Sequence, residues 1–157
     1  MDEKKIYEAI LNRFGEDAVT SYEDEGVSPP VVRVQGEKIC EVISSLRDDG
    51  TLLFDSLMCL SGADMGDWLE VVYHLHSMEH RHKITVKVVL DREFPQVPSI
   101  SSIHAVANFH EREAYDLFGI VFSGHPDLRR ILLPDDWPGN PLRKDYVYPD
   151  SYHGIKV

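Results

Sequence analysis

The sequence lacks most of the features that mark redox, membrane and secreted proteins. Its two cysteines, Cys40 and Cys59, are isolated and form no Cys-x-x-Cys pair. An iron–sulfur cluster needs about four thiolates, so this chain alone cannot hold one, and both cysteines are predicted to be small core residues. No apolar run approaches the roughly 20 residues of a membrane helix, and the opening MDEKKIYEAI lacks a signal peptide's apolar core. We expect a chain that stays in the cytosol or an equivalent compartment.

Basic residues are also scarce. The sequence has 16 Lys and Arg residues and 27 Asp and Glu residues, which gives a net charge of −11. Such a surface repels nucleic acid and anionic lipid, so we do not expect direct binding to either.

Catalytic motifs are missing as well. The chain has no Ser or Cys nucleophile in a recognisable frame, no phosphate-binding loop and no dinucleotide fingerprint. Five residues of one stretch could be combined into acid–base machinery: His110, Glu111, Glu113, Asp116 and His125. General acid–base catalysis needs a pocket and shifted pKa values, and a sequence shows neither. A simpler interpretation of the GHPD segment is a turn, in which the side chain of Asp127 could hold a backbone N–H.

The first hundred residues predict an α+β domain. Helical spacing of apolar residues predicts two amphipathic helices, residues 6–14 with Gly15 as the cap and residues 37–47. Short or alternating apolar runs predict five strands, at residues 18–22, 31–34, 51–60, 69–76 and 82–90. The last three form an antiparallel meander, because short polar turns join them. One face of the sheet should be packed by helices and the other partly wet.

The predicted fold is therefore α+β and two-layered, with helices on one face of a mixed, mainly antiparallel sheet and an extended carboxy-terminal arm. The division along the chain is residues 1–100 for the α+β domain, 101–119 for a helix and 120–157 for the arm. Ser101 or Ser102 can cap that helix.

The arm is too apolar to be a solvated tail. Gly119 and five prolines between positions 126 and 149 forbid a long helix or a central strand. Large side chains are nevertheless frequent, namely Ile120, Val121, Phe122, Leu128, Ile131, Leu132, Leu133, Trp137, Leu142, Tyr146 and Tyr148. Burying one such side chain contributes about 1.5 to 3 kcal/mol, so they should lie on the chain's own domain or on another protein. Charges of both signs are interleaved with them, and this mixture favours a partner-docking arm over a solvated, salt-bridged surface.

The same stretch resembles a known family. The run EREAYDLFGI followed by F-x-GHPDLRRIL-x-P-x-DW-x-G-x-PLRKDY, from Asn108 to Tyr146, resembles the signature of the thirty-kilodalton subunit, or C subunit, of respiratory complex I. Two departures are visible, since Phe109 stands where the family usually has Trp, and Val147 and Tyr148 precede the proline that usually follows LRKDY directly.

The resemblance implies a scaffold subunit without redox centres in the hydrophilic arm of a proton-translocating NADH:quinone oxidoreductase. It implies docking on the forty-nine-kilodalton subunit, or D subunit, near the quinone site, with iron–sulfur subunits as further partners. FMN, iron–sulfur clusters and quinone belong to the whole complex, which would lie on the cytoplasmic side of the plasma membrane. The residues expected to fix the docking geometry are Phe109, Glu111, Arg112, Glu113, Asp116, Asp127, Arg129, Arg130, Trp137, Arg143, Lys144 and Asp145.

Two alternatives remain. The nearer one is the homologous subunit of a membrane-bound hydrogenase or of a ferredoxin- or deazaflavin-dependent relative, because those assemblies share this module. The more distant one is a free-standing metal-binding or catalytic protein. Four histidines around one predicted hairpin, His74, His76, His80 and His82, lie at strand spacing and could bind zinc or nickel, although exposed hairpin histidines are the default interpretation.

Overall fold

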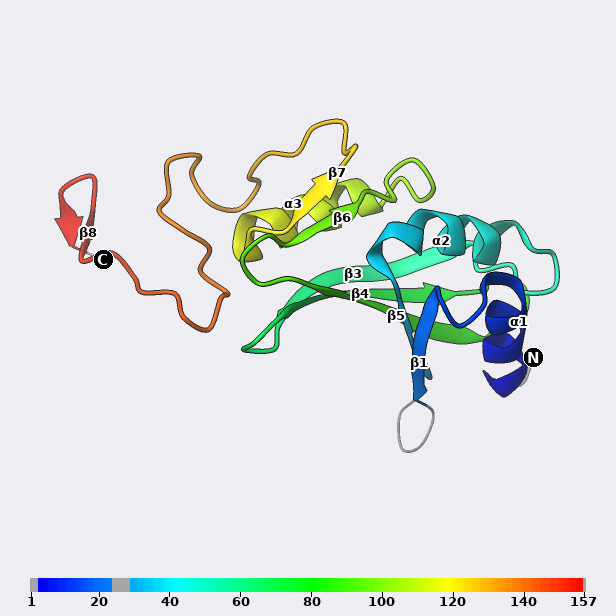
Figure 1. Cartoon of the computed structure of the whole chain (residues 1–157). Coiled ribbons are helices and arrows are strands. Elements are labelled where there is room, and N and C mark those ends of the chain that lie inside the picture. The colour runs from blue at the N-terminus through cyan, green and yellow to red at the C-terminus, as the bar shows by residue number, and fades with distance from the viewer. Residues whose placement is uncertain (1–2, 24–28, 157) are drawn as a thin grey trace.

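A five-stranded mixed sheet forms the body of the chain (Figure 1). The structure, a computed structural model, describes residues 3–23 and 29–156. The strand order is β1-β2-β5-β4-β3, and β2 runs parallel to β5 while the other neighbours are antiparallel. The strands of this sheet are β1 (Val19–Glu23), β2 (Val31–Val34), β3 (Ser56–Asp64), β4 (Leu69–His76) and β5 (Lys83–Leu90).

The helices complete a two-layer arrangement. Helices α2 and α3 lie over one face of the sheet, and α1 lies beside β1 (Figure 1). The remaining elements are α1 (Glu3–Phe14), η1 (Gly36–Lys38), α2 (Ile39–Asp48), β6 (Gln96–Pro98), α3 (Ala107–Phe118), β7 (Val121–Ser123), β8 (Ser151–Tyr152) and β9 (Ile155–Lys156). The predicted α+β fold class is confirmed.

Side-chain alternation decides which face of the sheet is buried. In β5, Ile84, Val86 and Val88 are fully buried on the helix-covered face, whereas Lys83 and Val89 are exposed on the other. An alternating strand has this pattern when one face packs on a core and the other meets solvent. The expected half-wet sheet is therefore confirmed.

Glycines end two of the helices as the sequence predicts. Gly15 has a φ of +73°, and its N–H donates to the carbonyl of Leu11. Gly119 has a φ of +74° and ends α3 in the same way. The expected start of α3 is wrong, because the helix begins at Ala107 and no side chain caps it. Ser101 instead lies in a turn before the helix.

The apolar run at residues 51–60 is not the strand that its composition predicts. β3 begins only at Ser56, and Leu52 and Phe54 fill the core from the loop that follows α2. Leu53 has a φ of +43°, which no regular strand allows. β3 then runs on through the segment expected to be a turn, and it carries Cys59 on its exposed side. Cys40 is half-buried against the core, but the prediction that Cys59 is a core residue is wrong.

Two short strands and the arm follow the sheet. β6 pairs in parallel with β7, a contact that no local pattern in the sequence indicates. Phe122 of β7 and Ile100 after β6 are buried in the main core. Beyond β7 the chain is irregular up to the small β8–β9 hairpin, and it extends away from the sheet as expected (Figure 1).

Candidate functional site

Helix α3 presents charged side chains on both its buried and its exposed surface. Glu111 and Asp116 are 0% exposed and Arg112 is 6% exposed, whereas Phe109 is 62% exposed and Glu113 also faces solvent. Buried charges are costly unless they are paired or hydrogen-bonded. The buried ones must therefore have partners within the chain, and the arm supplies most of them.

Asp116 holds the beginning of the arm against α3. Its Oδ2 accepts hydrogen bonds from the backbone N–H groups of Ile131, Leu132 and Leu133 at 3.0, 2.7 and 3.0 Å. Burial alone would raise the pKa of this carboxyl, but these three donors and Arg130 outweigh it, so the pKa lies below its ordinary value. Asp116 is thus an ionised anchor for the arm.

Arg130 extends the same anchor along the arm. One guanidinium nitrogen donates to Oδ1 and to the carbonyl of Asp116 at 2.9 and 3.2 Å. The other donates to the carbonyls of Trp137 and Gly139 at 3.1 and 3.0 Å. Arginine has five donors in a fixed plane, which suits such a junction of several acceptors. The Asp116–Arg130 pair therefore shapes the arm from within the chain.

The LRKD segment is fixed to the domain by a second set of contacts. The Nε of Arg143 donates to the carbonyl of Phe118, near the end of α3, at 2.7 Å. The backbone N–H of Lys144 donates to the carboxylate of Asp64, at the end of β3, at 2.8 Å. This part of the arm is therefore bound to both layers of the fold.

An ion-pair chain completes that attachment. Arg92 donates to Asp64 at 2.6 Å and to Asp145 at 2.8 Å, so it joins β3 to the arm. The hydrogen bond from Arg92, together with backbone donors, holds the pKa of Asp64 far below its ordinary range. The Asp145 end of the chain is more exposed, and water weakens its contribution.

Glu111 joins α3 to the turn after β6. It accepts hydrogen bonds from the hydroxyl of Ser99 at 2.6 Å and from the N–H of Ile100 at 2.8 Å. Burial raises the pKa of Glu111, and these two hydrogen bonds offset only part of that rise. His125 lies 3.8 Å from the carboxylate, and its Nε2 also lies 3.1 Å from the carbonyl of Asn108. Glu111 is a structural carboxyl in the interior of the chain.

The GHPD turn forms differently from its predicted geometry. The backbone N–H of Asp127 donates to Nδ1 of His125 at 3.0 Å, so the imidazole and not the aspartate holds the turn. The carboxylate of Asp127 instead pairs with Arg129 at 2.9 Å, with both side chains more than half exposed. The expectation for the Asp127 side chain is wrong, because its neighbour Arg129 offers a charged donor.

The twelve residues expected at the docking surface divide into two groups. Asp116, Arg130, Arg143 and Asp145 bind groups of this chain, as does Glu111, and Arg112 donates to the carbonyl of Arg129 at 3.3 Å. The indole N–H of Trp137 donates to the hydroxyl of Tyr146 at 3.0 Å. The side chains that remain at the surface are those of Phe109, Glu113, Asp127, Arg129 and Lys144.

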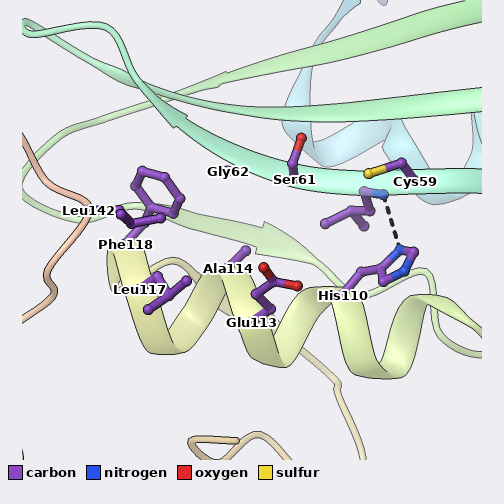
Figure 2. Close-up of a pocket in the computed structure, with 10 residues that line it drawn as sticks. Cys59, Ser61, Gly62, His110, Glu113, Ala114, Leu117, Phe118 and Leu142 are labelled. Carbon is purple, nitrogen blue, oxygen red and sulfur yellow. Dashed lines mark hydrogen bonds between the residues drawn. The ribbon is translucent and has the colours of Figure 1, made fainter. Parts of the chain in front are cut away.

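A groove of about 220 Å³ lies between α3 and the edge strand β3 (Figure 2). His110 and Glu113 project from α3 toward the strand, and Leu142 of the arm lies at the end of the groove near Phe118. Sequence reasoning missed the strand side of this groove. Its lining is Cys59, Leu60, Ser61, Gly62, His110, Glu113, Ala114, Leu117, Phe118 and Leu142.

The histidine hairpin does not form a metal centre in the part of the chain that the structure describes. No group there brings together three His, Cys, Asp or Glu side chains that could hold a metal ion. The ring of His80 faces the carbonyl of Gly50, and that of His82 faces the carbonyl of Leu52. His82 is only 7% exposed, so the default interpretation of exposed histidines is wrong at that position.

The fold and the attached arm define an α+β protein whose tail is shaped by its own helix α3, and comparisons with known proteins assign its family. Residues 32–152 match the family described as the respiratory-chain NADH dehydrogenase, 30 kDa subunit. The chain belongs to this family, which confirms the resemblance.

Two curated relatives are named as C subunits of NADH-quinone oxidoreductase. The protein from Chloroherpeton thalassium is 48% identical over 153 residues, which are 96% of this chain and 63% of that protein. The protein from Chlorobium phaeobacteroides is 42% identical over 154 residues, with coverage of 96% and 92%. The chain thus spans less than two thirds of the first relative and nearly all of the second.

Solved structures share the fold. A trypsin-resistant fragment of Nqo5 has a TM-score of 0.67 and 29% identity, covering 80% of this chain and 98% of the fragment. A chain of the membrane-bound sulfane sulfur reductase, an archaeal respiratory membrane complex, has a TM-score of 0.75 at 24% identity, with coverage of 92% and 85%. The second likeness concerns the fold alone.

Proposed function

We propose that this chain is a scaffold subunit, without a redox centre of its own, in the hydrophilic arm of a proton-translocating NADH:quinone oxidoreductase. It docks on the forty-nine-kilodalton subunit, or D subunit, near the quinone site, and it contacts iron–sulfur subunits of the same arm. NADH oxidation, quinone reduction and proton transfer belong to the assembly, whose other subunits hold FMN and the iron–sulfur clusters.

The observation that carries this proposal is the way in which the arm is attached. Most charged side chains of the arm form hydrogen bonds or ion pairs with other groups of this chain, whereas several of its large apolar side chains are exposed. They are Leu132 at 60%, Leu142 at 52%, Val147 at 85%, Tyr148 at 64% and Ile155 at 73%. Exposed apolar groups gathered on one segment are typical of protein–protein interaction sites. The arm is therefore preorganised for a partner, which lowers the entropic cost of binding.

The same proposal accounts for attachment to a membrane through the complex. No helix among the described residues is long and apolar enough to cross a membrane. In the proposed assembly the chain lies peripherally on the cytoplasmic side, held there by its protein partners.

A homologous subunit of a membrane-bound hydrogenase, or of a ferredoxin- or deazaflavin-dependent complex, is the second candidate. The fold shared with a chain of the archaeal sulfane sulfur reductase complex is the observation that favours it. Genes beside the coding sequence separate the two candidates. NADH-binding subunits favour the first, and a hydrogenase large subunit with intact nickel-ligating cysteines favours the second.

A pull-down in mild detergent tests the proposed function. The affinity tag belongs at the amino-terminal side of α1, because that helix lies far from the arm (Figure 1). We expect the forty-nine-kilodalton subunit and iron–sulfur subunits to co-elute. The identities of the other co-eluting subunits would then show which electron donor the complex uses. Recovery of the chain alone, soluble and monomeric, would contradict the proposal.

A further inference from the structure

The groove between α3 and β3 contains a carboxylate that has no partner in the described chain. Glu113 is exposed and projects from α3 toward β3 (Figure 2). No hydrogen bond or ion pair joins it to any of residues 3–23 and 29–156. Phe118 and the exposed Leu142 form an apolar wall at one end of the same groove (Figure 2). The groove therefore offers negative charge and apolar surface together.

The strand side of the groove adds hydrogen-bond acceptors. β3 is the outermost strand of the sheet, and the N–H of Leu60 points outward, where it donates to Nδ1 of His110 at 3.1 Å. In an antiparallel ladder the N–H and C=O of one residue point to the same side, and the side alternates along the strand. The register is regular from Leu60 to Asp64, so the carbonyls of Leu60 and Gly62 also point outward.

These features select one kind of side chain. A carboxylate and outward carbonyls accept hydrogen bonds, and apolar walls fit a hydrocarbon stem. An arginine provides both, since its guanidinium carries five donors and its stem packs on apolar surface. An acidic side chain would be repelled by Glu113, and a purely apolar one would leave that carboxylate desolvated and unpaired.

We propose that this groove receives an arginine side chain of the partner subunit, an inference that rests on the proposed function. The guanidinium pairs with Glu113 and the outward carbonyls of β3, and the stem packs against Leu142 and Phe118. The net charge of −11 favours the approach of a basic segment.

The test measures binding of the full chain to the forty-nine-kilodalton subunit of the same organism. We expect Glu113→Gln to weaken the affinity by roughly 30-fold or more, because the partner's charge is left buried without its counterpart. Glu113→Arg should weaken it further. The affinity of the wild-type chain should also fall more steeply with salt than that of Glu113→Gln. Glu79→Gln, the same change at an exposed acid in the β4–β5 hairpin, should leave binding unchanged.

Cross-linking identifies the side chain that enters the groove. A photoreactive residue in place of Leu117 should attach to a partner peptide in which an arginine adjoins the linked residue. The variants must retain the unfolding temperature of the wild type, and we expect this of Glu113→Gln because Glu113 is a surface residue.

The outcomes separate this inference from the proposed function. If the wild-type chain binds the forty-nine-kilodalton subunit but Glu113→Gln binds equally well, or if the linked peptide lacks arginine, the groove assignment is wrong and the scaffold function stands. If the wild-type chain does not bind that subunit, both are wrong.

Discussion

In the α+β domain, fully buried side chains such as Tyr73, Phe54 and Ile43 meet in one apolar core, whereas in the arm Leu132 and Leu142 remain exposed. The domain is thus held mainly by non-directional burial, and the arm by directed hydrogen bonds and ion pairs. Burial tolerates exchange of one apolar residue for another of similar size, but directed contacts need particular donors and acceptors. The difference explains why the recognisable residue identities concentrate in the least regular part of the chain.

Asp116→Ala should give the largest effect and should confine it to the arm. The change leaves Arg130 and three backbone N–H groups without their acceptor, at a cost of about 3 to 5 kcal/mol. Hydrogen exchange should then become fast at residues 130–140 while the sheet keeps its protection. Asp127→Asn, at an exposed ion pair, is the matched control. Uniform loss of protection over the whole chain would contradict the separation of the two regions.

Leu52→Ala should weaken the domain and not the arm. Leu52 is 4% exposed and fills the core from a loop, so its removal leaves a cavity at a cost of about 2 to 5 kcal/mol. Urea unfolding followed by far-UV circular dichroism measures the cost. Leu132→Ala, which shortens an exposed leucine of the arm, should change the free energy of unfolding by less than about 0.5 kcal/mol.

Protonation of Glu111 and protonation of Asp116 should have opposite effects on stability. Burial raises the pKa of Glu111, so the folded chain binds that proton more tightly than the unfolded chain, and the contribution of Glu111 to stability rises as the pH falls through this raised pKa toward the ordinary value of 4.5. Asp116 has a lowered pKa, so its stabilisation of the arm persists down to about pH 3.9 and is lost as the pH falls further. Relative to Glu111→Gln, the wild type should therefore become more stable in urea unfolding as the pH is lowered from 7 to the ordinary glutamate value of 4.5. A difference that stays constant over this range would argue against a raised pKa at Glu111.

Arg129→Ala should give the smallest change in folding and a clear change in assembly. Its ion pair with Asp127 is exposed, and water and salt leave such pairs little effect on stability. Thermal unfolding of the isolated chain should hardly change, while a native gel of the complex should show less of this subunit incorporated. Normal incorporation would remove Arg129 from the docking surface.

Local patterns in the sequence predict the elements that local forces determine. The spacing of Ile6 and Ile10 predicts α1, the alternation from Ile84 to Leu90 predicts β5, and Gly15 and Gly119 end their helices as expected. An apolar run that is neither alternating nor helical is ambiguous, because burial fixes no backbone conformation. For that reason the sequence predicts a strand where Leu52 and Phe54 enter the core from the loop after α2.

Contacts between distant segments could not be predicted. The hydrogen bonds from the N–H of Leu132 to Asp116 and from the N–H of Ile100 to Glu111 depend on how the chain folds back on α3. The spacing of apolar residues in the sequence contains no information about that path. The strand side of the groove was missed for the same reason, because Leu60 meets His110 across 50 positions of sequence. The signature contains charged residues of both kinds, and only the folded structure separates those that bind groups of this chain, such as Asp116 and Arg143, from those that stay exposed, such as Glu113 and Lys144.

The parallel pairing of β2 with β5 has a consequence for synthesis. Val31 lies opposite Thr85, so β1 and β2 cannot join the sheet until the chain has grown by another fifty or so residues. At the usual elongation rate of about 5 to 20 residues per second, this delay is roughly 3 to 10 seconds. During that time the β5 side of β2 is unpaired and Val32 and Val34 lack most of the core that later covers them, so this hairpin is the part of the nascent chain most exposed to premature association.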